Sequence, residues 1–222
     1  MKIIITGTTG MVGEGVLIEC LAHSQVTEVL SVSRKATGYT HPKLKEYLVS
    51  DFLSLKKNDE KLKGYDACFF CAGVSSIGMN ETDFTKFTYD TTLNFAKAVI
   101  NPQMTFIYVS GASTDSTEKG RLMWARVKGK TENDLMKQPF KQVFAFRPAA
   151  MQPTKGQTKS WWASYTYTKY LNWLYPILKV VYPNGVNTLR QVGNAMIEAA
   201  QNGYEKNVVE VKDITILAKR QE

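Results

Sequence analysis

The stretch MKIIITGTTGMVGEGVLIECL, residues 1–21, decides the fold of this chain. An apolar run at residues 3–5 leads directly into a turn that contains Gly7, Gly10 and Gly13, and the amphipathic pattern of a helix follows at once. A strand, a glycine turn and a helix in this order are typical of a dinucleotide-binding βαβ unit. We therefore expect the start of this helix to bind phosphates through its unpaired N–H groups and its positive dipole end.

Each glycine has a predicted role in that unit. Gly7 lets the chain turn sharply off the strand, Gly10 lets backbone amides approach a pyrophosphate, and Gly13 lets the helix pack closely on the sheet. The spacing is GxxGxxG rather than GxGxxG, so the prediction depends on the placement between a strand and a helix. The predicted phosphate-binding residues are Gly7, Thr8, Thr9, Gly10, Met11, Val12 and Gly13.

Length and composition fit one soluble α/β domain. The 222 residues are 44% hydrophobic and 22% charged, which is typical of a globular protein with a sizeable core. No apolar run reaches the ~18 residues that cross a membrane, and the first residues read as a strand rather than as a secretory signal. Three cysteines give no disulfide framework. We expect a single domain over residues 1–222, as a monomer or homodimer in the cytoplasm.

The net charge of +8 lies in the second half of the chain. Residues 1–100 carry 11 basic and 11 acidic side chains, whereas residues 101–222 carry 17 and 9. Nucleic-acid binding needs base-stacking or groove-reading motifs in addition to charge, and none occurs in the sequence. The excess charge therefore favours an anionic cofactor or small-molecule substrate together with ordinary surface lysines, and no nucleic-acid partner is expected.

Apolar runs alternate with helical patterns along the first two thirds of the chain. Six strands are predicted, at residues 3–5, 27–33, 44–49, 65–73, 104–110 and 142–147. This alternation predicts an α/β doubly wound parallel sheet, the Rossmann fold, with helices on both faces. Ligands of such sheets bind beyond the carboxyl ends of the strands, where we find Ser33, Asp51, Cys71, Ser110 and Pro148.

The residues at the end of the second predicted strand indicate which nicotinamide cofactor is bound. NAD-binding units usually place an acidic residue there, ~20 residues after the glycines, to bind the ribose 2′-hydroxyl. Here the strand ends in Ser33, Arg34 and Lys35, and a hydroxyl with two cations suits a 2′-phosphate. The alternative is that both cations are solvated loop charges. The pattern favours NADP(H) over NAD(H).

Further cofactor contacts are predicted at the ends of later strands. Asp51 can accept a hydrogen bond from the adenine amino group while Phe52 flanks the ring, although an exposed acidic residue is also common at a strand end. Pro148 follows the sixth strand and is a predicted contact as well. Small residues after the fourth strand leave room for the cofactor: Cys71, Ala72 and Gly73.

Residues 151–186 differ in composition from the rest of the chain, and we expect them to form a substrate-binding or lid insertion. Eight aromatic residues lie within residues 160–182, with lysines among them. Three interpretations stay open: a lid over a substrate pocket, a contact with a partner or a membrane surface through residues 161–182, and a small aromatic core.

Over nearly its whole length the chain resembles the short-chain dehydrogenase/reductase superfamily, in particular its atypical branch of NmrA-like and Tat-interacting-protein-like proteins. The resemblance implies the Rossmann fold and an NAD(P)(H) cofactor. The motifs that carry it are the glycine turn, Asp51-Phe52, Cys71-Ala72-Gly73, Val109-Ser110-Gly111, residues 127–132 and Arg147-Pro148.

By the same resemblance, catalysis requires a Tyr-x-x-x-Lys pair on the helix after the fifth strand and a serine at the end of that strand. The tyrosine transfers a proton, the lysine binds the nicotinamide ribose, and the serine binds the substrate oxygen. Lys128 matches the lysine, and Ser110 or Ser113 matches the serine, but Trp124 stands in the tyrosine position. An indole N–H donates a hydrogen bond but has no usable acid–base pKa.

No other residue clearly replaces the missing tyrosine. A literal Tyr-x-x-x-Lys occurs at Tyr165 and Lys169, but it follows the sixth strand, so it does not lie on the helix that faces the nicotinamide. Tyr108, on the fifth strand, is a candidate substitute donor, and no metal-ligand cluster is found. The sequence therefore predicts either an NADP(H)-binding oxidoreductase-like protein for a small carbonyl or sugar-like substrate, or a catalytically inactive NADP(H) sensor that acts through partners.

Overall fold

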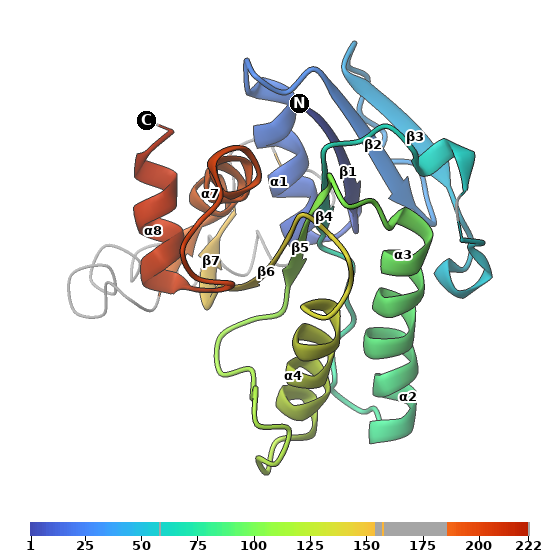
Figure 1. Ribbon diagram of the computed structural model, residues 1–222, viewed down its shortest axis with the longest axis vertical. Helices are drawn as coiled ribbons and strands as arrows, with labels where there is room; N and C mark the ends of the chain where they lie inside the picture. The colour runs from blue at the N-terminus through green and yellow to red at the C-terminus, as the bar shows by residue number, and fades with distance from the viewer. Residues whose placement is uncertain (58, 154–156, 158–185, 222) are drawn as a thin grey trace.

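A seven-stranded parallel sheet forms the centre of the computed structural model, which describes residues 1–57, 59–153, 157 and 186–221 (Figure 1). The strand order is β3-β2-β1-β4-β5-β6-β9, and every neighbouring pair is parallel. This arrangement confirms the predicted doubly wound sheet. The strands are β1 Lys2–Thr6, β2 Glu28–Ser33, β3 Leu44–Leu48, β4 Ala67–Phe70, β5 Thr105–Val109, β6 Gln142–Arg147 and β9 Val208–Glu210.

The strand order reverses at β1, and this reversal places the glycine turn in the middle of the carboxyl edge. Ile5 of β1 pairs with Ser31 of β2 on one side and with Phe69 of β4 on the other. The connections from β1 and β4 leave toward opposite faces of the sheet, and ligands of doubly wound folds bind at such a reversal, beyond the carboxyl ends of the strands. The turn after Thr6 lies at this position.

Helices cover both faces of the sheet (Figure 1). Successive strand residues point to opposite faces, so Ile3 and Ile5 belong to one hydrophobic cluster and Ile4 to the other. Residues of α1, α7 and α8 complete the first cluster, and residues of α3 and α4 complete the second. The helices are α1 Met11–Ala22, α2 Glu81–Thr85, a π-helix Lys86–Asp90, α3 Thr91–Val99, α4 Met123–Leu135, α7 Leu189–Asn202 and α8 Val211–Lys219, with short 3-10 helices at Phe52–Ser54 and Glu60–Leu62.

Two further strands, β7 (Ala150–Gln152) and β8 (Val186–Thr188), form a separate parallel pair. They flank the segment for which a lid insertion is predicted. Most of that segment, with its aromatic residues and with Tyr165 and Lys169, lies outside the described residues, so the three interpretations of residues 151–186 stay predictions.

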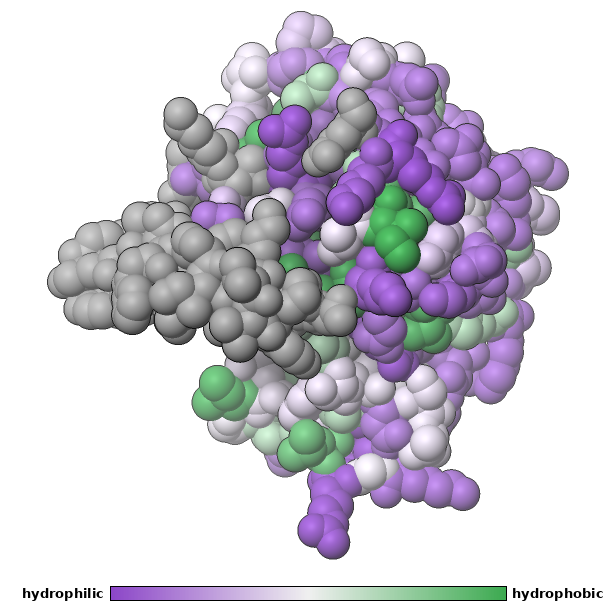
Figure 2. Space-filling view, turned by 90° about the vertical axis from the view of Figure 1, so that its left-hand side faces the viewer, coloured by the Kyte–Doolittle hydropathy of each residue, from purple (hydrophilic) through white to green (hydrophobic). Residues whose placement is uncertain are grey.

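Hydrophilic side chains predominate on the face shown in Figure 2, and hydrophobic side chains form small separate groups on it. Isolated apolar side chains of this kind are normal on a protein surface. None of the described helices is long and apolar enough to cross a bilayer. The large hydrophobic side chains that are exposed in the described part of the chain are Leu48, Ile77, Phe87, Leu122 and Ile216.

Candidate cofactor and active site

The glycine turn closes tightly at the end of β1. Gly7 has a φ of +70°, in the left-handed region, and its carbonyl accepts a hydrogen bond from the Gly10 N–H at 2.9 Å. A Cβ atom on Gly7 would also lie 2.7 Å from the carbonyl oxygen of Cys71. The sharp turn predicted at Gly7 is therefore present, and the end of β4 excludes any side chain there.

Gly13 packs against the turn itself. A Cβ atom on Gly13 would lie 2.2 Å from the carbonyl oxygen of Gly7 and 2.9 Å from the amide nitrogen of Thr8. The close contact that requires a glycine is thus made with the turn, whereas we predicted a contact with the sheet. The buried hydroxyl of Thr8 lies 2.7 Å from that of Ser31, and this hydrogen bond fixes the turn to β2.

The start of α1 fits the pyrophosphate of a dinucleotide. Gly10 is the exposed N-cap of α1, and no side chain among the described residues caps the helix. The N–H groups of a first helical turn have no intrahelical partner and lie at the positive end of the dipole. On the neighbouring segment, a Cβ atom added to Gly73 would meet no atom of the described residues within 4 Å.

Arg34 and Lys35 are exposed immediately after β2, and neither side chain is paired by a hydrogen bond or an ion pair in the part of the chain that the structure describes. Ser33 differs from them, because its hydroxyl is buried and donates to the carbonyl oxygen of Lys35 at 2.6 Å. We predicted that this hydroxyl would bind a 2′-phosphate. The structure corrects that prediction, since the hydroxyl closes the turn beyond β2 instead.

Asp51 and Phe52 have opposite surroundings. Asp51 is exposed, and its carboxylate accepts a hydrogen bond from the Leu53 N–H at 2.9 Å. Phe52 is only 8% exposed, and its ring centroid lies 5.0 Å from that of Phe95 in the core. This burial contradicts the prediction that the Phe52 ring flanks an adenine, whereas the predicted contact of Asp51 is not affected.

Cys71, Ala72 and Gly73 follow the last residue of β4 and line the glycine turn. The Ala72 N–H donates to the hydroxyl of Thr6 at 3.1 Å, which joins the ends of β4 and β1. Burial raises the pKa of the Cys71 thiol to about 12, so this thiol stays protonated and unreactive at neutral pH. All three cysteines of the chain are free.

The helix α4 brings Lys128 to the carboxyl end of β5. The ammonium group of Lys128 donates a hydrogen bond to the carbonyl oxygen of Ser110, the residue that follows β5. Burial lowers the pKa of Lys128 from its usual value, and the carboxylate of Glu132 opposes this effect. Trp124 is half-buried one helical turn before Lys128, on the same side of α4. The predicted lysine and serine are thus together, but the serine contributes its main chain.

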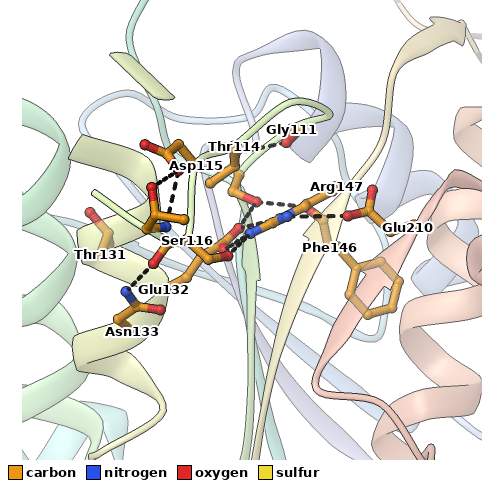
Figure 3. Close-up of polar contacts among 12 residues, drawn as sticks. Gly111, Thr114, Asp115, Ser116, Thr131, Glu132, Asn133, Phe146, Arg147 and Glu210 are labelled. Atoms are coloured by element: carbon orange, nitrogen blue, oxygen red, sulfur yellow. Dashed lines mark hydrogen bonds and ion pairs between the residues drawn. The ribbon is translucent and has the colours of Figure 1, made fainter. Parts of the chain in front are cut away.

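Glu132 and Arg147 form the centre of a buried polar network (Figure 3), and the hydroxyl of Ser110 donates a hydrogen bond to Glu132. Glu132 is 1% exposed and accepts hydrogen bonds from Ser110 Oγ and from Arg147, with 3.0 Å between Nε and Oε1 and 2.5 Å between Nη2 and Oε2. Arg147 also donates to Ser116 Oγ at 2.6 Å and to Glu210 Oε1 at 3.2 Å. The hydroxyl of Ser110 is therefore used inside the protein, which contradicts its predicted role as a ligand of a substrate oxygen.

The loop between β5 and α4 presents Ser113 instead. Ser113 is exposed and has a φ of +65°, a left-handed conformation that is uncommon for a residue other than glycine. The loop lies directly on α4, because a Cβ atom on Gly129 would be 1.8 Å from the carbonyl oxygen of Asp115. The glycine of the Lys128-Gly129 motif thus lets the loop close over the helix. Of the two candidate serines, Ser113 is the one that solvent reaches.

Two other candidates from the sequence lie in the interior. Tyr108 is a buried core residue of β5, and burial raises the pKa of its hydroxyl far above the usual value. This contradicts a role for Tyr108 as a substitute proton donor. Pro148 is buried just after β6, and its carbonyl accepts a hydrogen bond from the Ala112 N–H at 2.9 Å, beside the Ser113 loop.

Glu132 and the pairing of Arg147 were not predicted from the sequence. The available signal was the position of Glu132 four residues after Lys128, which puts both on one side of the helix. A carboxylate on the buried side of a helix must be paired. Arg147 at the end of a buried strand was the obvious cation, but sequence spacing alone does not bring residues 132 and 147 together.

A doubly wound sheet with an open glycine turn at its switch point defines a dinucleotide-binding α/β protein. Residues 3–120 match the model of the NAD dependent epimerase/dehydratase family, and the chain belongs to that family. A nicotinamide cofactor and a relation to short-chain dehydrogenases are therefore confirmed. The NmrA-like and Tat-interacting-protein-like branch and the preference for NADP(H) stay predictions.

Curated relatives with similar sequences are named as mitochondrial proteins. The chain is 24% identical over 164 residues to the mitochondrial protein fmp52-1 of Aspergillus terreus, and the match covers 71% of this chain and 70% of that protein. It is 27% identical over 157 residues to the mitochondrial protein FMP52 of Meyerozyma guilliermondii, covering 68% of this chain and 65% of that protein. These names contradict the predicted cytoplasmic location.

Solved structures of similar fold include enzymes of nucleotide sugars. MoeE5 in complex with UDP-glucose and NAD has a TM-score of 0.65 and 14% identity, covering 99% of this chain and 82% of that chain. UDP-glucose 4-epimerase of Thermotoga maritima with UDP-glucose has a TM-score of 0.61 and 13% identity, with the same two coverages, 99% and 82%. At these identities the likeness shows a shared fold.

Proposed function

We propose that this protein is an NADP(H)-binding, oxidoreductase-like member of the atypical short-chain dehydrogenase branch that takes a small carbonyl or sugar-like substrate. The observation that carries the proposal is a pair of exposed cations directly after β2, Arg34 and Lys35, whose side chains have no partner among the described residues. They follow the strand to which the glycine turn is bonded through Thr8 and Ser31, so they lie on the ribose side of a dinucleotide seated on α1.

The substrate class follows from the neighbours of the fold and from the groups at the carboxyl edge. MoeE5 and the epimerase are recorded with UDP-glucose, which supports a sugar-like ligand for this chain as well. Ser113 is an exposed residue of the β5–α4 loop, and its hydroxyl can hydrogen-bond a substrate oxygen. Lys128 lies close behind this loop, where its ammonium can bind the hydroxyls of the nicotinamide ribose.

Proton transfer distinguishes this chain from a complete family enzyme. The nicotinamide, when bound, supplies a hydride acceptor or donor. A carbonyl reduction also needs a proton, and Trp124 in the tyrosine position cannot supply it. Ser110 is engaged with Glu132 and Tyr108 is buried, so neither of them offers a proton at the site. The roles that remain for the described residues are binding and orientation.

This shortage of proton donors favours a second candidate function, an NADP(H) sensor that acts through a partner. In that case Lys128 binds the nicotinamide ribose, the Glu132–Arg147 ion pair stabilises the surrounding structure, and the bound nucleotide is the signal. The two candidates share the cofactor and differ only in turnover.

Nucleotide titration followed by a turnover assay tests both candidates. We expect NADPH to bind about tenfold or more tightly than NADH, because Arg makes charge-assisted hydrogen bonds to phosphate. Arg34→Ala should remove this difference and leave NADH binding unchanged. Equal affinities in the wild type, unaffected by Arg34→Ala, would overturn the NADP(H) proposal.

Turnover then decides between the enzyme and the sensor. NADPH oxidation is followed with a panel of carbonyl compounds and nucleotide sugars for the wild type, Trp124→Tyr and the matched control Trp124→Phe. Turnover by the wild type, or a gain confined to Trp124→Tyr, supports an oxidoreductase frame. Tight NADPH binding without turnover in any of the three proteins supports the sensor.

A further inference from the structure

The turn that carries Arg34 and Lys35 is anchored to its surroundings. At its start, the buried Ser33 hydroxyl donates to the carbonyl oxygen of Lys35 at 2.6 Å. In its middle, the N–H of Thr37, a residue with no exposed surface, donates to Glu46 Oε1 of β3 at 2.6 Å. The two exposed cations therefore project from a backbone that is fixed on both sides of them.

At the far end of the turn, Tyr39 reaches back to the phosphate-binding helix. Its hydroxyl donates to Glu14 Oε1 at 2.8 Å. Glu14 has no exposed surface and lies in the first turn of α1, directly after Gly13. The contact thus joins the turn after β2 to the helix end that fits the pyrophosphate.

Together with the Thr8–Ser31 hydrogen bond, this contact closes a ring. The ring runs from the glycine turn into α1, across Glu14 and Tyr39 to the turn after β2, and back through β2 to Ser31. A dinucleotide whose diphosphate lies at the start of α1 has its adenosine ribose within reach of this ring.

We propose that Tyr39 and Glu14 are positioning residues for cofactor specificity, which hold Arg34 and Lys35 where they meet the 2′-phosphate of NADP(H). This inference rests on the proposed NADP(H) binding and assigns the specificity to two more residues. A guanidinium binds phosphate well only in a fixed geometry, and a loop that must first be ordered loses affinity to that ordering. NADH lacks the 2′-phosphate, so its binding does not depend on the position of the cations.

The experiment is a double-mutant cycle on nucleotide affinity with the full chain. NADPH, NADH, 2′,5′-ADP and 5′-AMP are titrated against the wild type, Tyr39→Phe, Arg34→Ala and the double variant. Tyr39→Phe should lower the affinity for NADPH and 2′,5′-ADP about fivefold while NADH and 5′-AMP bind as before. In the Arg34→Ala background, Tyr39→Phe should cause a smaller loss than in the wild type, because only one of the two positioned cations, Lys35, remains.

Two matched variants separate this role from general structure. Tyr47→Phe removes a tyrosine–carboxylate hydrogen bond of the same length, 2.8 Å to Asp59 Oδ2, away from the turn, and should leave the NADPH-to-NADH ratio unchanged. Glu14→Gln keeps an oxygen that accepts from Tyr39 and should also preserve the ratio. A purely structural role would reduce the affinities for NADPH and NADH together, and that result overturns the inference.

The outcomes also separate this inference from the proposed function. If Arg34→Ala abolishes the preference for NADPH and Tyr39→Phe does not change it, the cofactor proposal stands and the positioning role is wrong. If the wild type binds NADPH and NADH equally, the cofactor proposal fails and the inference fails with it.

Discussion

The two halves of the candidate site use their polar groups in opposite ways. At the β1–α1 turn, glycines keep side chains away, and the N–H groups at the start of α1 have no capping side chain among the described residues. At the β5–α4 end, the polar side chains bind one another: Lys128 to the Ser110 carbonyl, Ser110 to Glu132, and Glu132 to Arg147. Among the described residues, the first half leaves N–H groups without a side-chain partner, whereas the polar groups of the second half are largely hydrogen-bonded within the protein.

This difference explains why the structure supports cofactor binding more strongly than catalysis. Phosphate binding depends on main-chain groups, which survive most substitutions as long as the glycines remain. Proton transfer depends on one side chain of suitable pKa in one place, and a single change from tyrosine to Trp124 removes it. A family member can therefore keep the residues that bind the cofactor while it loses the proton donor and uses the remaining polar side chains to stabilise its structure.

The largest effect on the unfolding free energy is expected from a substitution in the polar network at the β5–α4 end. Glu132→Ala leaves the buried Arg147 guanidinium with Ser116 and the half-exposed Glu210 as its remaining partners among the described residues. Loss of one member of a buried pair typically costs at least about 3 kcal/mol of unfolding free energy, and we expect that loss here. Urea denaturation of the purified variant measures it.

The matched control for this prediction is Glu81→Ala. The ion pair of Glu81 with Arg126 has 2.7 Å between the charged atoms, but its side chains are 53% and 25% exposed, so its removal should change the unfolding free energy by less than about 1 kcal/mol. NADPH affinity of the folded Glu132→Ala variant should stay close to that of the wild type. A collapse of that affinity would show that the two halves are not separable.

The second largest effect is expected from a substitution in the glycine turn between β1 and α1. Gly13→Ala places a methyl group 2.2 Å from the Gly7 carbonyl oxygen, and the turn must move to accept it. We expect a loss of about 2 kcal/mol of unfolding free energy from this overpacking, together with a loss of NADPH affinity of about tenfold or more. Thermal unfolding and nucleotide titration measure the two losses.

Gly73→Ala is the control for Gly13→Ala, because its added methyl group meets no atom within 4 Å. Its unfolding free energy should stay within about 0.5 kcal/mol of the wild type. If Gly73→Ala nevertheless weakens NADPH binding, the cofactor passes over this residue as predicted. Unchanged NADPH binding by Gly13→Ala would show that the turn does not hold the cofactor.

The sequence predicts the β1–α1 turn better than the β5–α4 end because the physical signals differ in range. The apolar run, the glycines and the helix pattern of residues 1–21 are neighbours in the chain, so local rules are enough to predict the strand, the turn and α1. Even there, the contact of Gly13 was assigned to the sheet, because the folding of the turn back onto the helix is a tertiary contact.

Errors arose wherever the direction of a side chain decided the role. Phe52 and Ser110 both stand at a strand end, the place where ligands bind, but their side chains turn inward to Phe95 and Glu132. Ser33 closes its own turn for the same reason. A position in the sequence predicts the edge of the sheet, whereas the direction of a side chain depends on partners that are distant in sequence.

The smallest expected effect is the contribution of Lys128 to the pH dependence of the unfolding free energy. Burial lowers the pKa of Lys128 in the folded protein below the value of 10.5 that applies to the unfolded chain. At pH values between these two pKa values, the unfolded chain binds more protons at this residue than the folded protein does. The contribution of Lys128 to the unfolding free energy therefore rises with pH across this window, is complete above pH 10.5 and is lost as the pH falls through the lowered pKa.

Lys128→Met removes this titration while it keeps most of the apolar stem of the side chain. We expect the melting temperature of the wild type to rise relative to that of Lys128→Met as the pH approaches 10.5 from below, and the other lysines cancel in this comparison. Lys137 is a surface control, since its hydrogen bond to Asp134 raises its pKa and Lys137→Met should give a difference of the opposite sign. A wild-type advantage over Lys128→Met that shrinks toward high pH would mean that Glu132 outweighs burial, so that Lys128 belongs with the polar network at the β5–α4 end and keeps its proton there.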